Sequence, residues 1–151
     1  MPLPRATELG LSEEQLLLRA TVREFAREKV APRAHAIDAA QSFPAESWAE
    51  AAELGLLGAT APTQHGGAGL GLIELCVVGE ELAAACVSTA ATVLHQADMV
   101  VGRIARHGSE EQKRRWLPGL IDGSLVGCLA MTEPEAGSDV MSMRTRAERV
   151  E

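Results

Sequence analysis

The segment TEPEAGSD, residues 132–139, contains the residue types best suited to hold a ligand. Thr132 and Ser138 supply hydroxyl groups, and Gly137 lets backbone amides come close to a guest because it has no side chain. This combination favours a polar or anionic ligand. A plain turn between two strands explains the same residues equally well, so the residue types alone leave both interpretations open.

Other suggestive segments fit simpler explanations. GGAGLG at 66–71 lacks the third glycine of a dinucleotide-binding loop, because Leu72 stands in its place, and no strand precedes it. The four histidines are scattered without the i, i+4 pairing of zinc ligands, so we expect no metal site. The basic run at 113–115 follows two glutamates and is typical of a solvent-exposed helix face.

Charge and length narrow the classes of function. The chain has 151 residues and a formal net charge of −7, from 21 acidic residues against 14 Lys and Arg. A nucleic-acid binder needs a basic face, so we expect no nucleic-acid partner. The sequence has no apolar run of about 18 residues that could span a membrane, and its N-terminus lacks the apolar stretch of a signal peptide. With three cysteines that lack CxxC spacing, these features predict a cytoplasmic protein without a membrane span.

Helical periodicity extends from residue 12 to about residue 124, so mainly helices must position these side chains. Ser12 with Gln15 and Ser109 with Gln112 form capping boxes, which mark helix starts. Pro32 is expected to end or kink the first helix. Further helices are expected at 45–54, 71–87 and 89–106, a loop at 59–71, and a basic helix that ends at 116 before a separate turn begins at 117–118.

After Gly123 the pattern changes to that of strands. LVGCLAM at 125–131 is a short apolar run of strand length, and MSMRTRAERV at 141–150 alternates with a period of two. The sequence therefore predicts a helical domain at 1–124 and the first strands of a truncated β-domain at 125–151. Because those strands would lack partners, we expect an exposed apolar edge at 125–131 that promotes association.

The segment LAMTEPEAGSDVMSMRTRA at 129–147 closely resembles the flavin-contacting signature of the acyl-CoA dehydrogenase family. The resemblance spans nearly the whole chain and implies a mainly α fold, in which the N-terminal helical bundle of that family is followed by the first strands of its β-domain. Other blocks of the family occur in the same order: LSEEQ at 11–15, VREFA at 22–26, FP at 43–44, ELGLLG at 53–58, HGGAGLG at 65–71, EEL at 80–82 and GSEEQKRRWLP at 108–118.

The resemblance implies an FAD enzyme that oxidises the Cα–Cβ bond of an acyl-CoA thioester to a trans-2-enoyl-CoA. Its electrons would pass to an electron-transfer flavoprotein, and full-length relatives are homodimers or homotetramers. Leu129, Met131 and Thr132 would line the flavin, whereas Gly137 and Ser138 would approach the FAD and the pantetheine arm of the CoA substrate. The acidic residues of the same loop, Glu133 and Asp139, would hold its shape rather than exchange protons.

By the same resemblance, His95, Gln96 and Met99 belong to a helix beneath the acyl chain and are candidates for contact with the substrate. For His95, a satisfied core position is the simpler alternative. Many members of the family have an aromatic residue where this chain has Leu129. With leucine at this position, the chain is similar to the isovaleryl and other branched- or short-chain members.

No residue of the chain is assigned as the catalytic base, because the family's catalytic glutamate falls beyond Glu151. The isolated chain is therefore expected to be inactive. Two other interpretations stay open. One is a non-catalytic, truncated helical module or subunit fragment, and the other is a flavin oxidase or monooxygenase on the same scaffold.

Overall fold

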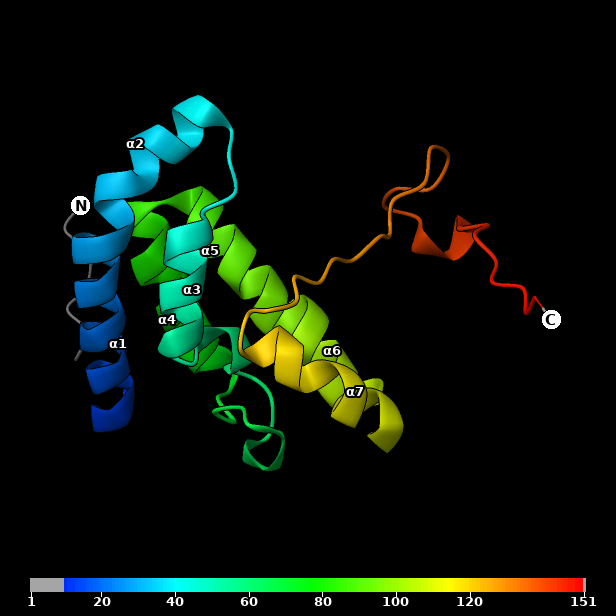
Figure 1. Ribbon diagram of the computed structural model, residues 1–151, viewed down its shortest axis with the longest axis horizontal. Helices are drawn as coiled ribbons and strands as arrows, with labels where there is room; N and C mark the ends of the chain where they lie inside the picture. The colour runs from blue at the N-terminus through cyan, green and yellow to red at the C-terminus, as the bar shows by residue number, and fades with distance from the viewer. Residues whose placement is uncertain (1–9, 151) are drawn as a thin grey trace.

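The computed structural model describes residues 10–150, which form a body of packed helices followed by an extended C-terminal segment (Figure 1). This mainly helical architecture confirms the expected fold class. None of the described helices is long and apolar enough to cross a membrane. The α-helices are α1 (Glu13–Phe25), α2 (Ala31–Ala40), α3 (Ala45–Glu53), α4 (Leu72–Ala85), α5 (Val87–Leu94), α6 (Arg103–His107) and α7 (Glu110–Ile121). Two π-helical segments, η2 (Ala26–Val30) and η5 (His95–Gly102), and three 3-10 turns, η3 (Leu56–Gly58), η4 (Thr63–His65) and η6 (Val140–Ser142), complete the set.

The first helix begins at the predicted capping box and bends before Pro32. Ser12 Oγ accepts a hydrogen bond from the Gln15 amide at 3.2 Å, and Gln15 Oε1 accepts one from the Ser12 amide at 2.9 Å. The chain stays helical from α1 through η2 into α2, with Pro32 in the first turn of α2. The helix changes direction there (Figure 1), which confirms the predicted kink; prolines and π turns are its usual causes.

The main core lies where α1, α3, α4 and α5 meet. Val22, Leu57, Leu82 and Val93 are almost completely buried in it. Helices α4 and α5 come close together at Gly79, where an added methyl group would lie 3.0 Å from Leu94 Cδ1. Each fully buried aliphatic side chain contributes roughly 1.5–3 kcal/mol, so this cluster is the main source of stability.

A buried carboxylate links α1 to α4. Glu81 is 8% exposed and accepts hydrogen bonds from Arg19 Nε at 2.7 Å and from Arg23 Nε and Nη2 at 2.8 and 2.7 Å. The two hydrogen bonds from Arg23, with the one from Arg19, hold the pKa of Glu81 below its ordinary value despite its burial. Glu81 is thus a structural anion between two helices.

Helix α7 continues through Pro118, so the break predicted between Trp116 and Leu117 was wrong. Proline removes one backbone hydrogen bond, but its fixed φ suits a helix, and burial of Leu117 and Leu120 on either side offsets the loss. Just after α7, Trp48 Nε1 donates a hydrogen bond to the Gly123 carbonyl at 2.9 Å. This contact fixes the point where the chain leaves the helices.

The expected strands do not form within residues 10–150. Residues 125–131 have no ladder partner, and a lone bridge between Glu133 and Ala136 closes a tight turn. The second expected strand, at 141–150, begins in the turn η6 and continues as unpaired chain. A strand is stabilised by its neighbours, which this part of the chain does not supply. The predicted exposure at 125–131 is confirmed for Leu125, Val126, Leu129 and Met131, whereas association through this edge stays a prediction.

Candidate functional site

A groove of about 530 Å³ lies between α4 and the continuous helix formed by α5 and η5. Residues three or four apart share one face of a helix, so one face of each helix forms a wall. An apolar groove of this size suits a chain-like, mostly apolar guest. Its lining consists of Leu72, Leu75, Cys76, Gly79 and Glu80 from α4, and Ala91, Leu94, His95, Asp98 and Met99 from α5 and η5.

Two of the predicted substrate-contact residues, His95 and Met99, lie in the wall of this groove. Its charged lining residues are both acidic. Asp98 is paired with Arg106 Nη2 at 2.9 Å, and Glu80 is exposed. No lysine or arginine is among the lining residues. The groove therefore offers no fixed cation to an anionic group.

The third predicted residue, Gln96, faces away from the groove. Its side chain is 1% exposed, and its Nε2 donates hydrogen bonds to the carbonyls of Leu120 and Leu125 at 2.8 and 2.9 Å. Its Oε1 accepts a hydrogen bond from the Gly127 amide at 2.9 Å. The structure thus places Gln96 against the chain that leaves α7, on a helix face next to that of His95.

The residues of the flavin-like signature, Leu129, Met131, Thr132, Gly137 and Ser138, are all exposed and lie beyond this anchor. Among the described residues, no hydrogen bond joins 128–150 to the helices. The structure therefore brings His95 and Met99 together in the groove, whereas the signature residues lie in the segment that extends away from the helices (Figure 1).

Glu133 fixes the local shape of that segment. Its carboxylate accepts hydrogen bonds from the amides of Arg144 and Thr145, each at 2.8 Å, and from the Thr145 hydroxyl. The Thr145 hydroxyl, followed by the two amides, lowers the pKa of Glu133. Asp139 likewise accepts a hydrogen bond from the Met141 amide at 3.2 Å. The two acids thus hold the shape of the loop, as predicted, whereas the absence of a role in proton exchange stays a prediction.

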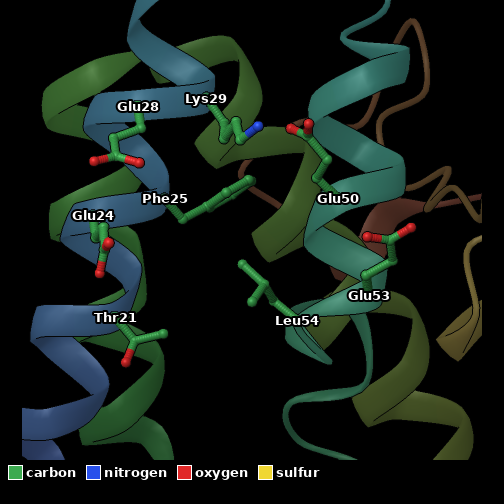
Figure 2. A pocket seen from close by; sticks show the side chains of 8 residues that line it. All are labelled: Thr21, Glu24, Phe25, Glu28, Lys29, Glu50, Glu53 and Leu54. Carbon is green, nitrogen blue, oxygen red and sulfur yellow. The ribbon is translucent and has the colours of Figure 1, made fainter.

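A second cavity, of about 540 Å³, lies between α3 and the helix formed by α1 and η2 (Figure 2). Its lining includes four glutamates and one cation, Lys29. Lys29 points towards Glu50 (Figure 2). Glu50 is held by Arg33 Nη1 at 2.5 Å, a contact that lowers the pKa of its carboxyl. This acidic lining would repel the phosphates of a nucleotide cofactor or CoA. We therefore exclude this cavity as their binding site.

No metal cluster is found among residues 10–150: no three His, Cys, Asp or Glu side chains are placed to share an ion. The three cysteines are free, and Cys76, in the groove wall, is exposed.

The arrangement of these helices matches the one in solved acyl-CoA dehydrogenases. A glutaryl-CoA dehydrogenase from Mycobacterium smegmatis, solved in complex with FADH2, superposes with a TM-score of 0.85 and 33% identity, over 93% of this chain and 36% of that chain. The sequence model for the acyl-CoA dehydrogenase N-terminal domain matches residues 12–124. The chain belongs to the acyl-CoA dehydrogenase family.

Two curated relatives are named after branched-chain acyl-CoAs. Isovaleryl-CoA dehydrogenase, mitochondrial, of Pongo abelii is 44% identical over 142 residues, which cover 93% of this chain and 34% of the relative. The 2-methylacyl-CoA dehydrogenase, mitochondrial, of Solanum tuberosum is 40% identical over 148 residues, which cover 97% of this chain and 36% of the relative. The chain thus spans about a third of the length of these relatives.

Proposed function

We propose that this chain is the N-terminal part of an FAD-dependent oxidoreductase that converts an acyl-CoA thioester to its trans-2-enoyl-CoA. The observation that carries the proposal is the apolar groove between α4 and the α5–η5 helix, in a chain of this family. The groove holds the acyl chain, with His95 and Met99 in its wall. No residue of this chain is proposed as the base that removes the α-proton.

The charge of the groove supports a neutral acyl group. An acyl chain that ends in a carboxylate would meet Glu80 and Asp98 without a lysine or arginine to pair with. Burying such an unpaired charge is unfavourable. Isovaleryl and 2-methylacyl groups are uncharged and branched, whereas a glutaryl group carries a terminal carboxylate. The proposed substrates are therefore short or branched neutral acyl-CoAs, which places the reaction in branched-chain amino acid or fatty acid catabolism.

The exposed signature residues fit a flavin. Leu129 and Met131 offer apolar surface, and the hydroxyls of Thr132 and Ser138 are exposed. A methyl group built on Gly137 would meet nothing within 4 Å, so its backbone is open to a ligand. Bound FAD would supply the hydride acceptor. Thr132 would donate a hydrogen bond where negative charge develops on reduction, and Gly137 and Ser138 would orient the FAD and the pantetheine arm.

The assembled enzyme is proposed to be a cytoplasmic homodimer or homotetramer that reduces an electron-transfer flavoprotein. A flavin oxidase on the same scaffold would instead consume oxygen. Oxygen uptake during turnover, measured beside reduction of an electron-transfer flavoprotein, separates the two.

The direct test is an anaerobic titration of the protein, expressed from its complete open reading frame and loaded with FAD. Isovaleryl-CoA is expected to bleach the flavin absorbance, whereas glutaryl-CoA is expected to bleach it at least tenfold more slowly. Glu80→Lys should narrow that preference, because it places a cation in the groove; Glu111→Lys on exposed α7 is the matched control. A protein that binds no flavin, or is never bleached by any acyl-CoA, would contradict the proposal and favour a non-catalytic module.

A further inference from the structure

Two neighbouring faces of one helix have different contacts. His95 and Met99, four residues apart, line the groove. Gln96 and Val100, also four residues apart, contact the chain that leaves α7. Residues four apart share a helix face, and consecutive residues point roughly 90–100° apart. The groove wall and the anchor for residues 125–127 are therefore two sides of the same helical turn.

The anchor uses the whole amide of Gln96. Both N–H groups are donated, to the carbonyls of Leu120 and Leu125, and the oxygen accepts the Gly127 amide. The side chain is 1% exposed, so water cannot replace these partners without a large rearrangement. Buried and fully satisfied polar groups of this kind fix one arrangement of the backbone.

Close packing reinforces the hydrogen bonds at Gly127. A methyl group at this position would lie 2.3 Å from Val100 Cγ1, so the backbone can come this close only because the residue is glycine. Leu129, the first residue of the flavin signature, follows two residues later, which is about 7 Å of extended chain.

The helix that carries the anchor is itself held in place. It is π-helical from His95 to Gly102, and the carbonyl of Ala97 accepts a hydrogen bond from Thr60 Oγ1 at 2.5 Å. Val101, one turn after Gln96, is fully buried against Leu117 and Leu120 of α7. The anchor is therefore part of the packed body.

We propose that Gln96 is a positioning residue, which fixes the distance between the acyl groove and the flavin-contacting segment. Gln96 does not touch the substrate. It acts through Leu125 and Gly127, so that the acyl chain beside His95 and the flavin beside Leu129 meet at the correct separation. The inference rests on the proposed function and adds to it a device that sets the geometry of the reaction.

The first test needs no flavin and uses this chain alone. Gln96→Leu keeps the side-chain volume and removes all three hydrogen bonds. Amide hydrogen exchange at Gly127 is expected to quicken about tenfold, which corresponds to the loss of one hydrogen bond. Trp48→Phe is the matched control, because it removes the bond to the Gly123 carbonyl from the start of the same segment. Equal rates of amide exchange at Gly127 in the two variants would overturn the inference that Gln96 anchors this segment.

The second test separates positioning from general loosening in the FAD-loaded enzyme. Gln96→Leu is expected to lower the rate constant for flavin reduction by isovaleryl-CoA about a hundredfold, with KM changed less than threefold, because small misplacements of reacting groups have effects of this size. Trp48→Phe is expected to leave both constants within threefold. A higher KM with an unchanged rate constant would show that Gln96 acts on substrate binding, and would overturn the inference.

Gly127→Ala displaces the same segment without changing Gln96, and it decides the matter if Gln96→Leu does not fold. It is expected to slow flavin reduction in the same way; an unchanged rate constant would overturn the inference. Failure of the wild-type enzyme to be reduced would instead contradict the proposed function, and the hydrogen-exchange result would stand by itself.

Discussion

The helical body and the C-terminal segment differ in what holds them. The body, residues 12–124, has a buried core and polar contacts between helices that are far apart in the sequence. The segment, residues 128–150, has exposed apolar side chains and is held mainly by contacts with its own neighbours. A helix satisfies its backbone hydrogen bonds internally, whereas a strand needs a second strand. An apolar run therefore forms an ordered element alone only when it is helical.

Two carboxylates show the difference in detail. Glu81 and Glu133 each accept three hydrogen bonds, and each has a lowered pKa. The partners of Glu81 lie 58 and 62 residues away, whereas those of Glu133 lie 11 and 12 residues away. The first therefore stabilises the tertiary structure, and the second shapes one loop.

The largest expected effect compares a leucine of each region. Leu82 is 0% exposed, and Leu82→Ala is expected to lower the free energy of unfolding by about 3 kcal/mol, because it opens a cavity in the core. Leu129 is 38% exposed, and Leu129→Ala should change the free energy of unfolding by less than about 0.5 kcal/mol. Urea denaturation measures both. Equal losses would mean that the segment packs against the body, which would break the comparison.

The next effect concerns the buried anion. Glu81→Gln keeps the shape of the side chain and removes its charge. It should lower the free energy of unfolding by about 2 kcal/mol at pH 7. This value is moderate because Arg23 is half exposed and solvent screens its charge. A lowered folded-state pKa stabilises the protein above the ordinary carboxyl value of 4.5, and this contribution is lost as the pH falls through the folded value. The difference between wild type and variant should therefore shrink below about pH 4.5. Denaturation midpoints from pH 7 to pH 3 measure it, and a constant difference would contradict the role of Glu81.

A smaller effect is expected at the junction of the two regions. Gly127→Ala places a methyl group against Val100 and should cost about 1–2 kcal/mol through overpacking. Gly137→Ala is the matched substitution in the segment, where the methyl group meets nothing, and should leave the unfolding free energy unchanged. If thermal melting shows the two variants to be alike, Gly127 does not seat the segment on η5.

The smallest effect is expected from Glu133→Gln. The amide offers weaker acceptors to Arg144 and Thr145 than the carboxylate does, so exchange of those two amide hydrogens should quicken. The denaturation midpoint of the body should stay as in the wild type. A lower midpoint would show that the loop supports the helices, contrary to the comparison.

Features set by neighbouring residues were predictable from the sequence. The capping boxes at Ser12 and Ser109 begin helices, and Gly55, with a φ of +74°, follows α3 as expected. Such signals depend on a few adjacent residues, whose side chains and backbone determine the local geometry. The same applies to Glu133, whose role in the loop was predicted.

Features set by distant contacts were not predictable. Gln96 occurs in an apolar helix, and its partners lie 24–31 residues further along the chain. Nothing near Glu81 in the sequence indicates that Arg19 and Arg23 surround it. Pro118 was expected to interrupt a helix, but tertiary burial of its neighbours outweighed the local preference. For the candidate site, the family resemblance indicated His95, Gln96 and Met99 together, whereas only the structure shows that Gln96 faces away from the groove.

The hydrogen bond from Trp48 to Gly123 gives the molecule an optical reporter. The chain contains no tyrosine, so its ultraviolet emission comes from two tryptophans alone. Trp48 is 5% exposed and donates its indole N–H at the end of the helical body, whereas Trp116 is 40% exposed beneath the Arg115 guanidinium. A ligand or substitution that moves the junction shifts the emission wavelength of the buried Trp48. The emission of the exposed Trp116 stays unchanged and serves as an internal reference. Intrinsic fluorescence can thus report changes at the junction between the helical body and the C-terminal segment without any added label.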